Sequence, residues 1–336
     1  MIDLRSDTFT RPTPAMLEAM HAAKVGDDVF GEDPTVNELE AYCAQLFGKP
    51  SALFCASGTM ANQIAIKCHT QPGNEVICEQ NSHVYIYEGG GIAFNSGCQV
   101  KPLVGERGLL RADQVSAVIN NEDIHKPISA LISVENTSNR GGGSCYDFGE
   151  LRKIKTVADA HQIPLHLDGA RLWNALAETQ EQPQDYGMLF DSISVCLSKG
   201  LGAPVGSVLV GEEAFIKKAR RFRKVLGGGM RQAGYLAAAG LYALNHHRER
   251  LKEDHAHAKQ IAASLAQKSY VARILPVETN MVIFETVDND AAELVAKWKA
   301  QGILCIAIAP NMIRIVTHLG VTAEMMKRLL AVLEVM

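Results

Sequence analysis

A lysine set between two apolar runs is the first residue whose position suggests chemistry. Lys199 follows the alternating apolar positions Ile193, Val195 and Leu197, and a turn of small residues at 200–204 comes next. Strand ends that face a core rarely carry an unpaired ammonium, because burying that charge is costly. Lysine amines in dry pockets lose their proton readily and attack carbonyl carbons. The stretch therefore fits either a lysine of a surface turn or a lysine that forms a Schiff base.

The stretch around Gly58 and Thr59 has the pattern of a phosphate site. A short apolar run at 51–55 predicts a strand, and a helix is expected from residue 60 to about residue 68. A turn of small residues between a strand and a helix presents free backbone N–H groups, which bind a phosphate well. Many turns share this pattern, so an ordinary turn is the alternative interpretation.

Polar residues also follow three other apolar runs that predict strands. His83, Glu135-Asn136 and Asp168 each stand just after such a run. Ligands of open α/β sheets bind at the carboxyl ends of the strands, so these residues are expected to converge. Asp168 could keep a pyridine nitrogen protonated, or it could be a helix N-cap. His83, which has Tyr87 nearby, could stack on a ring or simply be solvated.

The order of these residues along the chain indicates one cofactor. A glycine turn suits a phosphate, a histidine can stack on a ring, and a strand-end aspartate can hold a ring nitrogen protonated. Pyridoxal 5'-phosphate requires all three together with a lysine amine, and its ring withdraws electrons only while that nitrogen keeps its proton. The order therefore predicts a pyridoxal 5'-phosphate enzyme.

The strands and helices expected to position these residues follow the pattern of an α/β protein. Short apolar strands alternate with helices as far as residue 210, which is typical of a mostly parallel sheet with helices on both faces. From about residue 275 the pattern changes to β-α-β-β-α. We expect an N-terminal arm and a large domain over 1–245 and a small α+β domain over 246–336. Residues 1–36 look irregular except for a helix at 14–23.

Composition excludes several classes of function. The net charge of −4 disfavours nucleic acid and anionic membranes as partners. The eight cysteines show no zinc-type spacing and fit reduced thiols in a cytoplasmic protein. No signal peptide and no apolar run of the ~18 residues that a membrane span needs is apparent. No metal site is expected, because the histidines of one charged helix lack acidic partners at ligand spacing; these are His246, His247, His255 and His257.

Seven motifs give the chain a specific resemblance. They closely resemble the low-specificity L-threonine aldolases, which belong to the aspartate-aminotransferase-like (fold type I) pyridoxal-phosphate enzymes. The resemblance covers nearly the whole chain and implies a mostly parallel sheet flanked by helices, plus a small C-terminal α+β domain. The motifs are LRSDT (4–8), VGDDVFGEDPTVNELE (25–40), SGTMAN (57–62), HLDGARLWNA (166–175), CLSKGLGAPVGSVLVG (196–211), GGGMRQAG (227–234) and RIVTHL (314–319).

The resemblance assigns the cofactor site residue by residue. It implies that Lys199 forms the Schiff base, that Asp168 pairs with the pyridinium nitrogen and that His83 stacks on the ring. Gly58 and Thr59 then take the phosphate through backbone and hydroxyl donors.

The resemblance also assigns the substrate site. Arg171 is expected near the cofactor's phenolate oxygen and the substrate carboxylate, which Ser6 and Arg314 hold as well. Arginine suits this task because its planar fork matches a carboxylate. His125 matches a family histidine that approaches the substrate hydroxyl, and Tyr87 is expected on the substrate side.

Two further residues imply a neighbouring subunit. Lys224 and Arg231 flank a triple glycine and are expected to reach a phosphate or the site mouth of another copy, in line with the homotetramer usual in the family. The chain departs from the family pattern after Thr137, where it reads Ser138-Asn139-Arg140 and three glycines instead of His-Asn-Gly. Substrate preference is therefore expected to depend on the loop 138–143.

The expected reaction is a retro-aldol cleavage. A β-hydroxy-α-amino acid, L-threonine or L-allo-threonine, would give glycine and an aldehyde. His83 or His125 is the expected base, since imidazole titrates at about 6.5 and suits neutral pH. Two alternatives stay open: a β-eliminating lyase or transaminase on the same fold, and a non-catalytic protein that binds pyridoxal phosphate.

Overall fold

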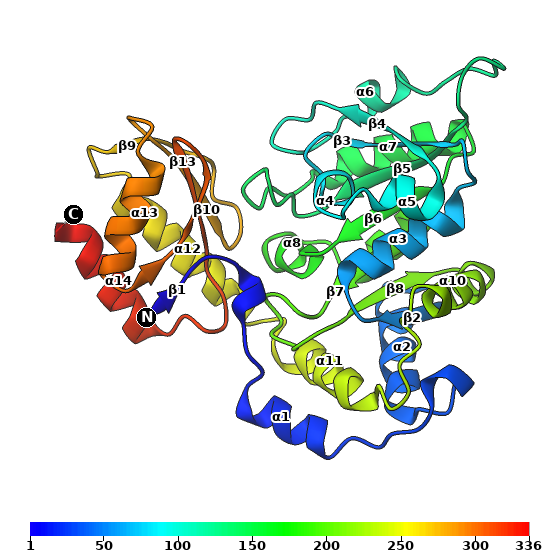
Figure 1. The fold of residues 1–336 in the computed structure, drawn as a ribbon, viewed down its shortest axis with the longest axis horizontal. Coiled ribbons are helices and arrows are strands. Elements are labelled where there is room, and N and C mark those ends of the chain that lie inside the picture. Colours follow the sequence, from blue (N-terminus) through cyan, green and yellow to red (C-terminus); the bar gives the residue numbers. More distant parts are fainter. Residues whose placement is uncertain (336) are drawn as a thin grey trace.

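A seven-stranded sheet forms the centre of the larger part of the molecule (Figure 1). The computed structural model describes residues 1–335. β8 is antiparallel to both of its neighbours, and the other adjacent pairs are parallel. The expected mostly parallel sheet is confirmed. Its strands, in spatial order, are β2 (Ser51–Cys55), β8 (Ser207–Gly211), β7 (Ser192–Cys196), β6 (Leu165–Gly169), β5 (Ser129–Glu135), β3 (Glu75–Glu79) and β4 (Gln99–Leu103).

Helices cover both faces of this sheet because alternate strand residues point to opposite sides. Leu53 and Leu209 pack on one side, where α3 (Gly58–His69) and α10 (Glu213–Val225) lie. Phe54 joins the larger core on the other side. That core is covered by α2 (Pro34–Phe47), α7 (Phe148–Ala160), α9 (Pro183–Leu189) and α11 (Gly234–His246).

A four-stranded antiparallel sheet organises the smaller part. Its core holds Phe284 and Trp298, whose rings lie 6.1 Å apart. The helix α12 contributes to both cores, since Leu251 packs in the first and Leu265 in the second. The boundary between residues 245 and 246 stays a prediction. The elements are α12 (Leu251–Leu265), β9 (Val271–Ile274), β10 (Met281–Thr286), α13 (Ala291–Ala300), β12 (Ile306–Ala309), β13 (Met312–Val316) and α14 (Ala323–Val335).

The N-terminal arm is more ordered than the sequence indicated. β1 (Ile2–Asp3) pairs in parallel with β11 (Ile303–Leu304), so Ile2 and Leu4 are buried in the smaller core. The expectation of an irregular start was wrong here, because the pairing partner lies 301 positions further along the chain. The expected helix at 14–23 is present as α1 (Pro14–His21).

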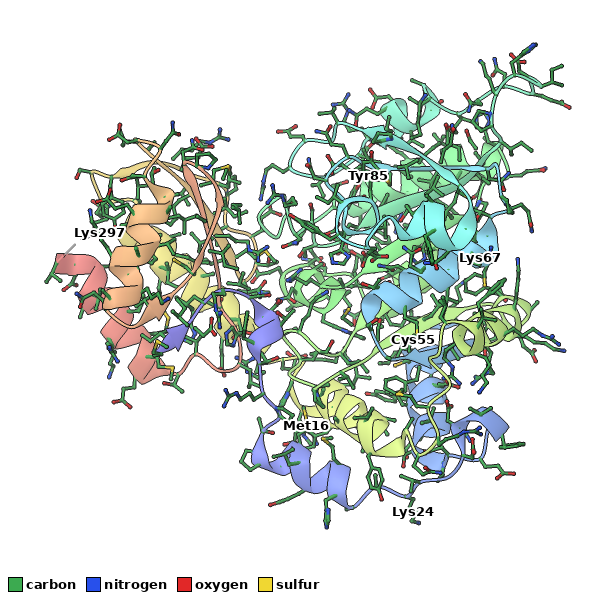
Figure 2. The ribbon with its side chains drawn as sticks, viewed as in Figure 1. Met16, Lys24, Cys55, Lys67, Tyr85 and Lys297 are labelled. Atoms are coloured by element: carbon green, nitrogen blue, oxygen red, sulfur yellow. The ribbon has the colours of Figure 1, made fainter. Side chains whose placement is uncertain are left out.

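Short helices make up most of the remaining structure. Packing is dense throughout: Cys55 lies in the interior, whereas the side chain of Lys297 stands on the outer surface of α13 (Figure 2). No helix within residues 1–335 is long and apolar enough to cross a membrane. The short helices are α4 (His83–Ile86), α5 (Gly91–Ser96), α6 (Ala112–Ser116) and α8 (Leu172–Glu178), with 3-10 turns at Asp7–Phe9 and Asp28–Phe30.

Asp33 joins three segments near the start of α2. Its fully buried carboxylate accepts hydrogen bonds from the backbone N–H groups of Thr35 and Val36, at 3.1 and 3.0 Å, and so caps the helix. The same carboxylate accepts from the N–H groups of Gly26 and Gly234, at 3.2 and 2.8 Å. One side chain therefore fixes the chain before α2 and the first turn of α11.

We expect Asp33→Ala to lower the free energy of unfolding by about 3 kcal/mol. Losing a cap costs about 1 kcal/mol, and each buried N–H left without an acceptor costs about 1 kcal/mol more. Urea denaturation followed by circular dichroism would measure the change. Glu32→Ala, at an exposed neighbouring position, should change stability by less than about 0.5 kcal/mol. Equal effects of the two substitutions would contradict the assignment.

Candidate active site

The carboxyl ends of four parallel strands gather a set of polar side chains at one edge of the large sheet. β6 supplies Asp168, β5 supplies Glu135, and the segments after β3 and β7 supply His83 and Lys199. Carboxyl ends of parallel strands share an edge, so this convergence follows from the topology. A ring nitrogen of His83 and one carboxylate oxygen each of Asp168 and Glu88 lie within 4.8 Å of one another.

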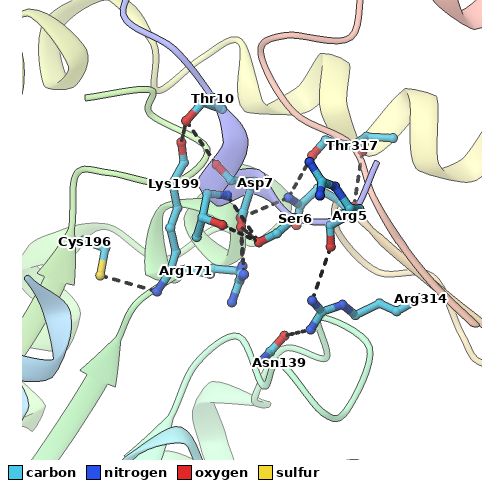
Figure 3. Close-up of polar contacts among 12 residues, drawn as sticks. Arg5, Ser6, Asp7, Thr10, Asn139, Arg171, Cys196, Lys199, Arg314 and Thr317 are labelled. Atoms are coloured by element: carbon cyan, nitrogen blue, oxygen red, sulfur yellow. Dashed lines mark hydrogen bonds and ion pairs between the residues drawn. The ribbon is translucent and has the colours of Figure 1, made fainter. Parts of the chain in front are cut away.

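Lys199 presents an amine with little to bind it. Its Nζ lies 3.5 Å from the Sγ of Cys196, and none of the ion pairs found within residues 1–335 includes it (Figure 3). Its backbone carbonyl accepts a hydrogen bond from Thr10 Oγ1 at 3.0 Å, which ties the lysine to the N-terminal arm. The side chain is half-buried. This amine is therefore placed inside the molecule without a carboxylate to neutralise it.

The N-terminus of α3 opens next to that amine. Ser57 caps the helix, accepting from Met60 N at 3.2 Å, and the N–H groups of Gly58 and Thr59 belong to the first turn, which has no intrahelical acceptors. A Cβ at position 58 would lie 2.7 Å from Cys196 Sγ, so only glycine fits there. The expected phosphate site thus lies against the strand that leads to the lysine.

Asp168 is nearly fully buried at the end of β6. Its Oδ1 accepts from the N–H of Ala170 at 3.0 Å, and its Oδ2 accepts from Asn62 Nδ2 at 2.9 Å. The N-cap of α8 is Arg171, so the alternative interpretation of Asp168 as that helix's N-cap was wrong. A buried carboxylate held by amide donors is suited to pairing with a cation in the site.

His83 is held at both its backbone and its ring. The N–H of His83 donates to Glu135 Oε2 at 2.8 Å, and the ring Nδ1 lies 2.9 Å from Glu88 Oε1. Burial alone would lower the pKa of His83. The hydrogen bond to Glu88 and the negative charges of Asp168 and Glu88 outweigh burial and raise that pKa above its usual 6.5. The ring of Tyr87 lies 5.8 Å away, centroid to centroid.

Glu135 is a titratable group that was noted in the sequence but given no role. Burial and the neighbouring negative charge of Asp168 raise its pKa to about 7. It accepts backbone hydrogen bonds from His83 and from Asn139, the second residue of the divergent loop. Glu88 and Asn62 were missed altogether; a search for a carboxylate close after His83 would have found Glu88.

The arginines expected to bind a carboxylate differ in what they contact. Arg171 donates Nε and Nη2 to Asp7 at 2.8 and 2.7 Å, so two of its donors are already used (Figure 3). Arg314 donates to Asn139 Oδ1 at 2.8 Å and to the carbonyl of Arg5 at 3.3 Å. Burial and the positive charge of Arg171 lower the pKa of Arg314. Among the described residues, Arg314 has no carboxylate partner and its buried Nε makes no hydrogen bond, so it is the more available guanidinium.

The Ser6 hydroxyl makes its hydrogen bonds within the N-terminal arm. It is buried, and its Oγ accepts from the backbone N–H of Thr8 at 3.3 Å and the hydroxyl of Thr8 at 2.9 Å. Its Oγ also lies 3.4 Å from Asp7 Oδ1, so Ser6 belongs to the arm segment that meets Arg171.

Three expected site residues do not join the cluster of their own chain. The side chain of His125 is 84% exposed and pairs with Asp123. His125 lies four residues before β5 begins, at the amino edge of the sheet. The site lies at the carboxyl edge, so the expectation that His125 approaches the substrate is not met within one chain. Lys224 is exposed beside a surface cavity of about 380 Å³, and Arg231 is exposed and pairs with Asp27 at 2.8 Å.

Comparison with known proteins agrees with this geometry. A sequence model described as "Beta-eliminating lyase" matches residues 3–289. The chain belongs to the beta-eliminating lyase family. It is 44% identical over 332 residues to the low specificity L-threonine aldolase of Escherichia coli strain K12, covering 98% of each chain. It is 43% identical to low-specificity L-threonine aldolase 1 of Arabidopsis thaliana, covering 96% of this chain and 92% of that protein.

The fold agrees with solved structures as well. The threonine aldolase of Leishmania major superposes with a TM-score of 0.87 at 23% identity, covering 99% of both chains. A putative L-allo-threonine aldolase of Listeria monocytogenes gives a TM-score of 0.81 at 24% identity. The expected fold and the resemblance to the low-specificity L-threonine aldolases are thus confirmed.

The Asp7–Arg171 pair makes a pH-dependent contribution to stability. Burial raises the pKa of Asp7, but the charge and hydrogen bonds of Arg171 outweigh burial and lower it to about 2. Because the folded-state pKa lies below the unfolded value, the contribution is complete above about pH 4 and is lost as pH falls toward 2.

We expect Asp7→Asn to destabilise the protein by about 3 kcal/mol at pH 7, since it leaves a buried guanidinium without its counter-charge. The difference from the natural chain should shrink between pH 4 and pH 2, as measured by urea denaturation across pH. Asp3→Asn, at a partly exposed pair with Arg5, provides the control and should cost less than about 1 kcal/mol. A pH-independent loss in Asp7→Asn would contradict the prediction.

Proposed function

We propose that this protein is a pyridoxal 5'-phosphate-dependent lyase that cleaves L-threonine or L-allo-threonine to glycine and acetaldehyde. The observation that carries the proposal is the unpaired amine of Lys199, which lies at the strand edge that also bears Asp168 and His83. The identity to low-specificity L-threonine aldolases over nearly the whole chain supports the same reaction.

The residues present fit the proposed cofactor. The cradle beside Gly58, which a Cβ would fill, and the free N–H groups at the start of α3 suit a phosphate. Asp168 offers a buried carboxylate for a protonated ring nitrogen, and Lys199 offers the amine. When bound, pyridoxal 5'-phosphate supplies an electron sink for cleavage of a bond at the substrate's Cα.

The chain's own residues would then orient the substrate and move one proton. Arg314 binds the substrate carboxylate, and Asn139 holds that guanidinium from the other side. Nε2 of His83 would accept the proton of the β-hydroxyl as the Cα–Cβ bond breaks and the aldehyde leaves, and a proton returned to Cα would then give glycine. Tyr87 lines the same side of the site, and Ser6 and Arg171 keep the arm closed over it.

A second copy of the chain is part of the proposal. His125, Lys224 and Arg231 are exposed and lie outside the cluster of their own chain, so we assign them to the site of a neighbouring subunit in a homotetramer. Exposed apolar side chains support such an assembly, among them Phe30, Phe94, Ile124 and Val225. The eight free cysteines support a reducing, cytoplasmic location.

A product assay separates the proposed reaction from its alternatives. Purified protein supplied with pyridoxal phosphate and L-threonine should release acetaldehyde and glycine in equal amounts. Release of 2-oxobutyrate and ammonia would show β-elimination instead, and an exchanged amino group would show transamination. No product from either substrate isomer, with cofactor bound, would contradict catalysis and leave a binding protein.

We expect Lys199→Ala to lose all measurable turnover, because the variant lacks the amine to which the cofactor is proposed to bind. Borohydride reduction of the natural protein, followed by peptide mass spectrometry, should attach the cofactor to Lys199. Lys297→Ala, on the outer surface of α13, is the control that should keep Lys199 labelled. Labelling at another lysine would remove Lys199 from the proposed role.

A further inference from the structure

The ring of His83 can accept a proton only at the nitrogen that lacks one. A neutral imidazole carries its proton on either Nδ1 or Nε2, and the other nitrogen is the acceptor. An acceptor beside one nitrogen holds the proton there, and the other nitrogen is then left without a proton. The neighbours of Nδ1 therefore decide whether Nε2 of His83 can act as a base.

Glu88 is the neighbour of Nδ1, and its side chain is fully buried. Its Oε1 lies 2.9 Å from His83 Nδ1 and 3.0 Å from Asn62 Nδ2, and its Oε2 lies 2.6 Å from Gln63 Nε2. Both of the other partners are amide N–H donors. Glu88 therefore accepts hydrogen bonds from two amides and can share a proton only with His83.

The orientation of both amides is fixed by what lies behind them. The Oδ1 of Asn62 accepts from Ser194 Oγ at 2.6 Å and faces His166 Nε2 at 3.2 Å, so its Nδ2 must face the carboxylates. Burial lowers the pKa of His166 to about 4, so this ring is neutral, and the donor that fixes the Asn62 oxygen is the hydroxyl of Ser194. The Oε1 of Gln63 accepts from Asn95 at 3.1 Å, which turns its Nε2 toward Glu88.

The proton between Glu88 and His83 therefore resides on the more basic partner, the imidazole. We propose that Glu88 is a positioning residue that keeps the proton on His83 Nδ1 and leaves Nε2 free to accept the proton of the substrate hydroxyl. The inference rests on the proposed function, because it concerns the base of that reaction. It assigns a role to a buried carboxylate that does not itself touch the substrate.

Other charges also act on the ring of His83. Asp168 from β6 and Glu88 favour the protonated ring, whereas burial and Lys199 disfavour it. Glu135 from β5 holds the backbone N–H. The base form of His83 exists above its pKa, so turnover should fall as pH drops through that value. Removing the charge of Glu88 lowers the pKa and should move this fall to lower pH.

Two substitutions separate the charge of Glu88 from its hydrogen bond. Glu88→Gln keeps an oxygen that can accept from Nδ1 but removes the charge, so kcat should drop roughly tenfold and the acid limb should move to lower pH. Glu88→Ala removes the acceptor as well and frees the ring, so kcat should drop about 100-fold. KM should change by less than about threefold in both, because Glu88 binds no part of the substrate.

Glu75→Gln is the matched control. Glu75 is also buried, but it begins β3 and therefore lies at the edge of the sheet away from His83. Its carboxylate accepts hydrogen bonds from three side chains, those of Asn120, Ser129 and Gln99. It makes no contact with His83, so its substitution should leave the pH profile unchanged. A shift of the acid limb in Glu75→Gln equal to that in Glu88→Gln would overturn the inference.

The proton position can be read without any assay of turnover. In holoenzyme carrying 15N-labelled histidine, long-range 1H–15N spectra distinguish the two ring tautomers, and His83→Asn identifies the signals of His83. We expect the Nδ1–H form in the natural chain and in Glu88→Gln, and a mixture in Glu88→Ala. An Nε2–H form in the natural chain, or no change in Glu88→Ala, would overturn the inference.

The outcomes distinguish this inference from the proposed function. If the natural enzyme formed no acetaldehyde but His83 changed tautomer in Glu88→Ala, the proposed function would fail and the positioning by Glu88 would stand. If acetaldehyde formed normally and Glu88→Ala kept full kcat, the positioning role would fail and the aldolase would stand.

Discussion

The buried ion pair between Asp7 and Arg171 is the contact on which the site depends. Residues 2–4 of the arm belong to the smaller core, whereas Arg171 follows β6 of the large sheet. A buried pair repays its loss of hydration only with good geometry, and here two parallel hydrogen bonds provide it. The same arm segment donates to the carbonyl of Lys199. The pair thus fixes the position of the small sheet, and of Arg314 on it, relative to the amine.

Burial of several acidic groups around one histidine sets the electrostatics of the site. Glu88, Glu135 and Asp168 are all nearly inaccessible to water, which would be prohibitive for three free charges. A side-chain amide stabilises two of them, since Asn62 bridges Asp168 and Glu88 with a single NH2 group. In the third, Glu135, burial and the charge of Asp168 raise the pKa to about 7, so this carboxyl stays protonated in more acidic solution. Near neutral pH, the site therefore carries fewer negative charges than its composition suggests.

The sequence was sufficient for the strands of the large sheet and for the place of Lys199 after one of them, because six of the seven strands are short runs that are almost fully buried, the edge strand β4 being the exception. It was insufficient where a partner lies far along the chain, as for β1, whose pairing with β11 leaves no local pattern. His125 shows a second limit: the resemblance predicts a role at the site for this residue, but its exposed side chain lies away from the cluster of its own chain, so the role stays a prediction. Asn62 and Glu88 were missed because an amide and a carboxylate on helical segments look like ordinary polar positions until their distances are known.

The pairing of β1 with β11 also orders events during synthesis. Once β1 has been made, it can pair with β11 only after about 300 more residues have been added, which takes roughly 15 to 60 s at ordinary elongation rates. Until then the arm that carries Asp7 and Thr10 lacks the strand that anchors its first residues. The large sheet can assemble early, but the arm is anchored on the smaller part only once β11 has been made, so a nascent chain that lacks β11 carries the residues of the site without a fixed arm beside them.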